Sequence, residues 1–134
     1  MKSLYSIEKN RLNNNFLDKF KVYNFSLIKE TKIFLVGSTR FKDYFIKIES
    51  ILQINHDKLA SICSIDGLLN KEKFSTTEWK KLQEIALKKL IHQEAILVID
   101  VENYIGDHSK EEIIYFTNSL QRPVYYLSDL KMVG

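Results

Sequence analysis

The chain has 134 residues, of which 45% are hydrophobic and 28% charged, a composition typical of one soluble globular domain. Its four glycines and single proline exclude collagen-like, Gly/Ser-linker and Pro-rich disordered classes. The formal net charge is +3, and residues 1–30 account for all of it with six Lys/Arg and three Asp/Glu. Residues 31–134 are neutral, which argues against a groove for a nucleic-acid polymer, because such a groove needs clustered cations.

The single cysteine, Cys63, cannot form a disulfide within the chain. The first 30 residues contain no apolar stretch typical of a secretory leader. No run approaches the roughly 20 apolar residues of a membrane span. The three histidines lack the spacing of metal ligands. We therefore expect a protein of the reducing cytoplasm, without membrane contact, bound metal or other cofactor.

Residues 1–30 are predicted to form a basic N-terminal arm that precedes the body of the chain, residues 31–134. Residues 19–27 fit a short strand, because aromatic and apolar side chains alternate along them. A helix up to about residue 20 fits equally well. We expect the arm to pack on the body or on a second subunit.

The body alternates strand-like and helix-like patterns. A short apolar run that suits a strand buried on both faces occurs at residues 32–37. Further strands are predicted at residues 58–65, at 95–100, which is the clearest strand in the chain, and at 124–127. Apolar residues spaced three and four apart predict helices over residues 41–52, 75–90 and 109–120. The last two helices begin with Ser-x-x-Glu, the capping-box pattern that satisfies free backbone N–H groups. Turns or loops are predicted at residues 66–67, 68–74 and 104–108.

This order of elements predicts an α/β fold. Strands that alternate with helices pair in parallel through right-handed crossovers, so we expect a three-layer sandwich around a small, mainly parallel, Rossmann/flavodoxin-like sheet of four to five strands. Ligands of such folds lie beyond the carboxyl ends of the strands. Three segments should therefore converge: residues 37–40, the loop after Ile65, and residues 100–112.

The first of these segments, Gly37-Ser38-Thr39-Arg40, has features of an anion site. A glycine after a strand lets a ligand approach the backbone, and free N–H groups at a helix start attract an anion. Two hydroxyls and the guanidinium of Arg40 would add donors for phosphate or carboxylate. The simpler interpretation is a glycine turn with a Ser/Thr cap and a solvated arginine. The segment is neither a Walker A loop nor a GxGxxG motif.

Glu112 has two interpretations as well. It is the fourth residue of the capping-box pattern that starts at Ser109, which is a structural role. In the first turn of a helix its carboxylate would also be stabilised as an anion by the helix dipole, and such a carboxylate at a strand-end cleft can attack an anomeric carbon. Its neighbour Glu111 is predicted to face water.

Other polar residues follow the third strand. Asp100 ends an apolar run, where it would bind a ligand hydroxyl or cap the loop. Asp107 lies in a Gly-Asp-His turn, which favours aspartate on conformational grounds alone. His108 titrates near neutrality when unperturbed, and a loop position would leave it exposed. Cys63 falls inside a strand-like run and is predicted to be inert core.

Five segments occur in a fixed order: Val36-Gly37-Ser38-Thr39-Arg40-Phe41, Ile96-Leu97-Val98-Ile99, Tyr104-Ile105-Gly106, Glu112-Ile113 and Arg122-Pro123-Val124-Tyr125-Tyr126-Leu127. Together they resemble the nucleoside 2-deoxyribosyltransferase-like superfamily. The likeness is greatest to small bacterial and phage members, which read GSTRF near the start, YIGxST in the middle and PVxYL at the end. The resemblance covers residues 32–128.

The resemblance implies cleavage or exchange of the N-glycosidic bond of deoxynucleosides or their 5′-monophosphates. Glu112 would be the nucleophile, and we place Asp100 and Tyr104 with it as catalytic candidates. The substrate-binding candidates are Gly37, Ser38, Thr39, Arg40, Gly106, Asp107 and Ser109. The implied ligand is a small nucleoside or nucleotide, and the implied assembly is a homodimer or larger homo-oligomer.

The chain departs from the family pattern at one important place. The family carries a second acid/base group on the helix before the third strand, and alignment without gaps places Ala86 there. The segment between the second strand and residue 75 is also short. A second hypothesis is therefore a catalytically impaired module that binds or senses nucleotides, and a third is a structural or partner-binding role for the chain.

Overall fold

The computed structural model describes residues 11–132, which build an α/β sandwich around one parallel sheet. The strands are β1 (Lys32–Gly37), β2 (Leu59–Ser61), β3 (Ala95–Ile99) and β4 (Val124–Tyr126). Their order across the sheet is β2-β1-β3-β4, and all three neighbouring pairs are parallel. The fold class expected from the sequence is thereby confirmed.

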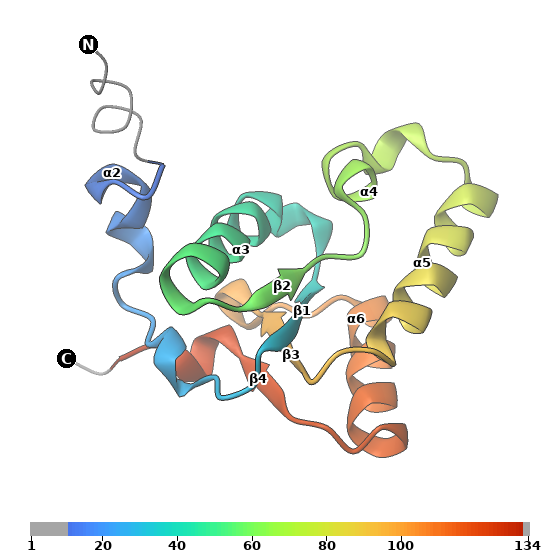
Figure 1. Cartoon of the computed structure of the whole chain (residues 1–134). Helices are drawn as coiled ribbons and strands as arrows, with labels where there is room; N and C mark the ends of the chain where they lie inside the picture. The colour runs from blue at the N-terminus through green and yellow to red at the C-terminus, as the bar shows by residue number, and fades with distance from the viewer. Residues whose placement is uncertain (1–10, 133–134) are drawn as a thin grey trace, which may run out of the picture.

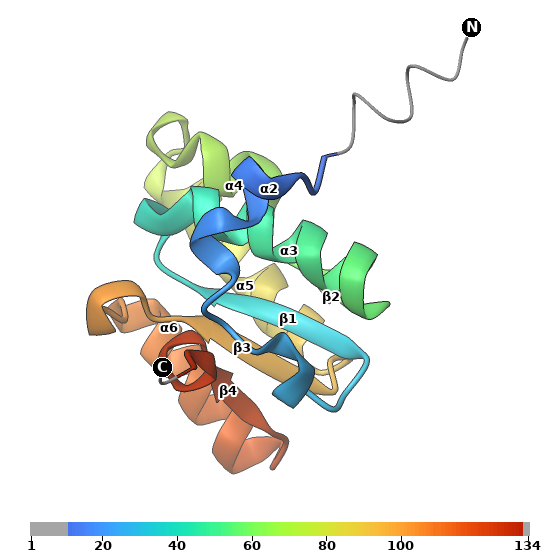
Figure 2. The ribbon, with the colours of Figure 1, turned by 90° about the vertical axis from the view of Figure 1, so that its left-hand side faces the viewer.

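The helices cover both faces of this sheet. They are α2 (Asn14–Leu17), α3 (Lys42–His56), α4 (Ile65–Leu69), α5 (Thr76–Leu90) and α6 (Asp107–Ile114). Helix α3 and the N-terminal segment lie on one side of the sheet, and α5 and α6 lie on the other (Figure 1). The view turned by 90° shows the same division, with α2 and α3 together on one side (Figure 2). Helix α6 continues into a π-helical turn, Tyr115–Ser119.

The strands form two cores because successive side chains point to opposite faces. Ile33, Leu35, Leu97 and Ile99 face α3 and the N-terminal segment, whereas Phe34, Val36, Ile96 and Val98 pack with Leu90 and Phe116. All five residues of β3 are buried. This explains the continuous apolar run in the sequence, since a central parallel strand has no solvent-facing side.

The N-terminal segment belongs to the core of the body. Phe16, Phe20, Phe25 and Ile28 are buried with the residues of α3, and Tyr23 forms an antiparallel bridge with Lys131. The strand considered for residues 19–27 is wrong, because this stretch contains two 3₁₀ turns, whereas the helical alternative near residue 20 is confirmed by α2 and the turn that follows it. The first ten residues of the predicted arm lie outside the described residues.

The connection after β2 differs from the prediction. The strand covers only Leu59–Ser61, and residues 66–67, predicted as a turn, lie inside α4. The expected loop at 68–74 contains the end of this helix and a 3₁₀ turn. Gly67 is buried against Trp79: a Cβ placed on it would lie 3.2 Å from the indole ring. The absence of a side chain therefore brings α4 onto α5. Among residues 11–132 no helix has the length and apolar character to span a membrane.

Candidate functional site

A cavity lies at the carboxyl ends of β1 and β3, the two central strands. Strands β2 and β3 lie on opposite sides of β1, so the strand order changes direction here. Open α/β sheets bind ligands at such a switch point. Three predicted segments meet in its wall and contribute Gly37, Thr39, Ser64, Gly67, His108 and Glu112. Helix α5 closes the cavity with Trp79, Gln83 and Ala86. Its volume is about 60 Å³, room for a few water molecules.

Glu112 is the acidic group of this cavity. Its side chain is only 8% exposed, and within the described residues its carboxyl group takes part in no hydrogen bond. Burial, with a smaller contribution from the charge of Glu111, raises its pKa to about 7. An isolated buried carboxylate is costly, so the folded chain holds a proton here to unusually high pH.

This result corrects the expectation for the start of the last helix. Helix α6 begins at Asp107 with Gly106 as its N-cap and no side-chain cap, so the capping box predicted for residues 109–112 does not form. Glu112 falls in the second turn, and Ser109 is buried inside the helix. The predicted dipole-stabilised anion in the first turn is wrong, because burial dominates at this position.

His108 faces Glu112 across one turn of α6. Its Nε2 atom lies 4.0 Å from Oε2 of Glu112, and its Nδ1 atom lies 3.7 Å from Oε2 of Glu111. The Nε2 atom is buried and has no hydrogen-bond partner. Burial lowers the pKa of the imidazole, while Glu111 partly offsets this effect. The sequence prediction placed His108 in an exposed loop and missed it as a site residue, although its i, i+4 spacing to Glu112 was visible.

The segment after β1 forms the predicted turn and cap. Gly37 approaches β3 so closely that a Cβ would lie 3.0 Å from the carbonyl oxygen of Ile99. Ser38 caps the 3₁₀ turn Thr39–Phe41, with its hydroxyl accepting from the N–H of Arg40. The guanidinium of Arg40 lies 3.9 Å from the centre of the Tyr104 ring, a cation–π contact that fixes its direction.

An open groove of about 540 Å³ adjoins the cavity, and Thr39 lines both. Its cationic residues are Arg40, Lys42 and Lys71, against one anionic residue, Glu72. Its wall also contains Ser38, a predicted substrate-binding residue, and Tyr104, a predicted catalytic residue. The excess of cationic side chains makes the groove suited to an anion.

Three predicted site residues lie elsewhere or make other contacts. Both carboxylate oxygens of Asp100 accept hydrogen bonds from Ser128, one from its N–H at 2.9 Å and one from its hydroxyl at 2.6 Å. Asp100 does not line the cavity around Glu112, and its side chain does not cap the 3₁₀ turn that follows it. It instead ties the end of β3 to Ser128 in the turn after β4. Asp107 is fully exposed and faces Lys110, while Gly106 is half-buried as the N-cap of α6.

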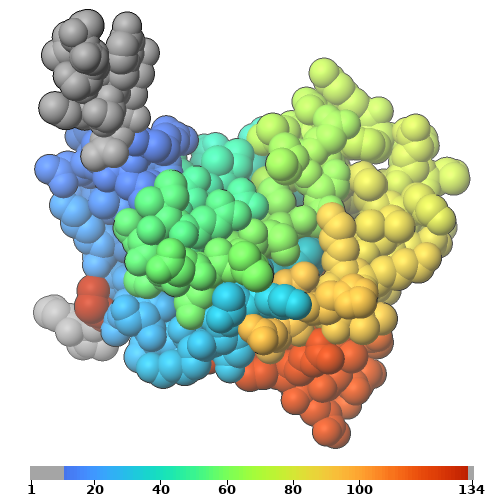
Figure 3. Space-filling model, in the orientation of Figure 1, coloured from blue at the N-terminus to red at the C-terminus, as the bar shows by residue number. Residues whose placement is uncertain are grey.

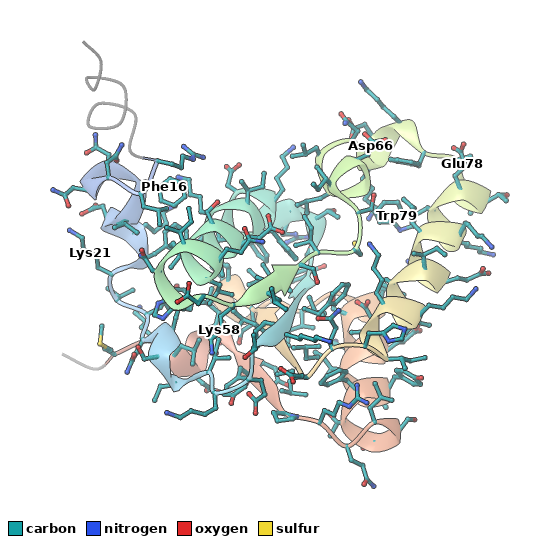
Figure 4. All side chains as sticks on the ribbon, viewed as in Figure 1. Phe16, Lys21, Lys58, Asp66, Glu78 and Trp79 are labelled. Atoms are coloured by element: carbon teal, nitrogen blue, oxygen red, sulfur yellow. The ribbon has the colours of Figure 1, made fainter. Side chains whose placement is uncertain are left out.

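Cys63, Ala86 and Trp79 form apolar parts of the cavity wall. Cys63 follows β2 rather than lying within it, and burial with the nearby Glu112 raises the pKa of its thiol. Ala86 faces the cavity at the position where the family resemblance implies an acid/base group. Trp79 lies on the side of α5 that faces α4 (Figure 4). Both helices project from the end of the molecule opposite the N-terminal segment (Figure 3).

The chain matches no protein-family model, no curated protein and no solved structure. Residues 11–132 contain no group of three or more His, Cys, Asp or Glu side chains placed to hold a metal ion. The class defined by the fold and the site is thus an α/β protein with a buried carboxyl group at the switch point of its sheet. The cytoplasmic location expected from the sequence stays a prediction, and so does the homo-oligomer that the resemblance implies.

Proposed function

We propose that this protein cleaves or exchanges the N-glycosidic bond of 2′-deoxynucleosides or their 5′-monophosphates, with Glu112 as the nucleophile. The observation that carries the proposal is the carboxyl group of Glu112, which is buried, free of hydrogen bonds within the described residues and directed into a strand-end cavity. The carboxylate of Asp100 differs from it: Asp100 is buried as well, but each of its two oxygens accepts a hydrogen bond from Ser128. A buried group left without a partner at this place suits a reacting atom.

The reaction would be a displacement at the anomeric carbon. An oxygen of Glu112 forms a bond to C1′, the C1′–N bond breaks, and its electron pair leaves with the base, which takes up a proton. Water or a second base then attacks C1′ and releases the carboxylate. Two displacements at one carbon retain its configuration, which gives the proposal a stereochemical signature.

The cationic groove beside the cavity is an argument for a substrate that carries a 5′-phosphate. Arg40, Lys42 and Lys71 provide cationic groups, and Arg40 is held by its contact with Tyr104. Thr39 joins the groove to the cavity, so that a phosphate in the groove would direct the sugar toward Glu112. A nucleoside exceeds the volume of the cavity, and Trp79 is the wall residue that we expect to move when it binds.

The test is incubation of the full chain with deoxynucleosides and their 5′-monophosphates, with and without a free acceptor base. We expect release of base, detected by chromatography, and its loss in the Glu112→Gln variant. Glu84→Gln is the matched control, because it removes a carboxylate of α5 whose side chain is 61% exposed and that does not line the cavity. Absence of base release with every substrate over hours at high enzyme concentration would contradict the proposal.

A second candidate is a module that binds nucleotides without turnover. The specific observation in its favour is Ala86, which presents a methyl group to the cavity where the resemblance implies an acid/base group. The single tryptophan of the chain, Trp79, lines the same cavity, so its fluorescence reports binding directly. A fluorescence change with deoxynucleoside monophosphates, without any base release, would favour this candidate.

A further inference from the structure

We infer that His108 delivers the proton to the departing base and that it shares this proton with Glu112. The inference rests on the proposed function, because it assigns the proton donor for the same displacement. It supplies the group that Ala86 cannot provide. It also uses a residue that the sequence prediction treated as exposed loop.

The geometry places one imidazole nitrogen beside the nucleophile. His108 and Glu112 are four residues apart on α6, and their Nε2 and Oε2 atoms lie 4.0 Å apart in the wall of one cavity. Neither atom has a hydrogen-bond partner among the described residues. The buried Nε2 atom lacks a hydrogen-bond partner, and a ligand group or a water molecule in the cavity beside the two atoms could bond to both.

The other charged and titratable groups around the pair do not provide a proton at neutral pH. Glu111, on the same helix, is exposed and holds the opposite nitrogen of His108 at 3.7 Å, which orients the ring. Cys63 lies between β2 and α4, and burial raises the pKa of its thiol. Lys89 of α5 donates to the carbonyl oxygen of Cys63. The remaining side chains that α5 gives the cavity, Trp79, Gln83 and Ala86, do not titrate in this range.

The pair also explains how a protonated carboxyl group becomes a nucleophile. Burial raises the pKa of Glu112 to about 7 and lowers that of His108, so the ligand-free pair holds one proton on the carboxyl group beside a neutral imidazole. Transfer of this proton to His108 creates a carboxylate and an imidazolium. The site then contains both an ionised nucleophile and an acid, and its total charge is unchanged.

The first step then balances without another reactant. Glu112 attacks C1′ and forms a C–O bond, the C1′–N bond breaks toward the base, and the base nitrogen takes the proton of imidazolium His108. In the second step water attacks C1′, loses a proton to the now neutral His108, and Glu112 leaves as a carboxylate. His108 therefore ends protonated, ready for the next cycle.

The experiment compares two leaving groups in the full-length chain. 2′-Deoxyguanosine must be protonated as its base leaves, whereas 7-methyl-2′-deoxyguanosine already carries the positive charge; their 5′-monophosphates are used if the wild type requires phosphate. A general acid contributes about 100- to 10,000-fold to a rate. Base release is followed in a single turnover at pH 7, so that it reports the first step alone, with Glu112 partly ionised without help from His108 because its pKa is about 7. We expect His108→Ala to slow this release by at least about 100-fold from the first substrate and by less than about 10-fold from the methylated one.

Two controls separate a chemical role from a structural one. Free imidazole should restore part of the rate of His108→Ala on 2′-deoxyguanosine, a rescue that a misfolded variant would not show. His92→Ala is the matched histidine variant, because His92 is exposed near the end of α5 and away from the cavity. We expect it to keep the wild-type rate on both substrates.

The outcomes distinguish the two proposals. If the wild type releases base but His108→Ala loses both substrates equally, or neither, the role of His108 is overturned and that of Glu112 stands. If the wild type releases base from no deoxynucleoside or 5′-monophosphate, the proposed function fails and the role of His108 fails with it. In active wild type, selective loss on the unmethylated substrate with rescue by imidazole is the result that supports the inference.

Discussion

The buried carboxyl group of Glu112 makes the free energy of unfolding depend on pH, and the single substitution Glu112→Gln should remove this contribution. Its pKa is raised from 4.5 in the unfolded chain to about 7 in the folded one, so the folded state binds the proton more tightly. The full stabilisation by this group is present below pH 4.5 and is lost as the pH rises through 7. Glu112→Gln keeps the shape of the neutral carboxyl group and removes the titration.

The magnitude follows from the two pKa values. One pKa unit corresponds to about 1.4 kcal/mol, so the difference between 4.5 and about 7 amounts to roughly 3 kcal/mol once the group is ionised in both states. Most of this change falls between pH 5 and pH 8. We therefore expect the free energy of unfolding of Glu112→Gln, relative to the wild type, to rise by about 2 to 3 kcal/mol over that range.

The assay is urea denaturation of both proteins at several pH values, followed by the fluorescence of Trp79. Glu84→Gln is the control, and its difference from the wild type should be nearly constant with pH because its side chain is exposed and lies outside the cavity. The lowered pKa of His108 opposes folding as the pH falls below 6.5, and the imidazole is present in all three proteins. A difference between Glu112→Gln and the wild type that stays flat from pH 5 to pH 8 would refute the reasoning.

Three further changes test the fold around the site. Phe20→Ala should lower the free energy of unfolding by about 3 to 5 kcal/mol, because Phe20 is 3% exposed and its ring centre lies 5.4 Å from that of Tyr44. An effect below about 1 kcal/mol would contradict the packing of the N-terminal segment on the core. Gly37→Ala should cost about 1 to 3 kcal/mol, since its Cβ would lie 3.0 Å from the carbonyl oxygen of Ile99, and an unchanged melting temperature would argue against that approach. Asp100→Ala should cost about 1 to 3 kcal/mol by leaving Ser128 without its two acceptors; equal urea midpoints would contradict a stabilising role for these two hydrogen bonds.

The sheet could be predicted because its two central strands are short, continuous apolar runs, too short for buried helices. Residues 95–99 are apolar without interruption and form the most buried strand, β3, and residues 32–37 form β1. Strands and helices that alternate in sequence leave only parallel pairing with crossovers. The second strand was predicted too long, because the chain leaves the sheet after Ser61: Cys63 and Ser64 line the cavity, and Ser64 caps the start of α4.

The N-terminal segment could not be placed from its pattern. Aromatic and apolar residues that alternate over a few positions fit either a strand or two successive turns, and only the partner surface decides between them. Here the partner is α3, which receives Phe16, Phe20 and Phe25 from the segment as one cluster. The basic charge of the segment favoured an arm that contacts a partner, whereas its buried aromatic residues are what place it against α3.

The two Ser-x-x-Glu patterns show why the site was harder to predict than the fold. At Ser75 and Glu78 both reciprocal hydrogen bonds form, because this helix starts in solvent where the two side chains have no other contacts. At Ser109 and Glu112 the same pattern lies inside a helix that has already begun at Asp107. The local sequence permits both starts, since glycine and serine are both acceptable N-caps, and tertiary packing selects between them.

That difference of one helical turn determines the chemistry of the site. A start at Ser109 would leave Glu112 in the first turn, where free N–H groups and the helix dipole stabilise its charge. A start at Gly106 moves Glu112 into the second turn and onto the buried face with Ser109 and Phe116, where desolvation favours the protonated form. The same shift makes His108 part of the helix and directs it toward Glu112. Under the proposed function this carboxyl group must lose its proton before it attacks carbon, and the fold places an imidazole one turn away that could receive it.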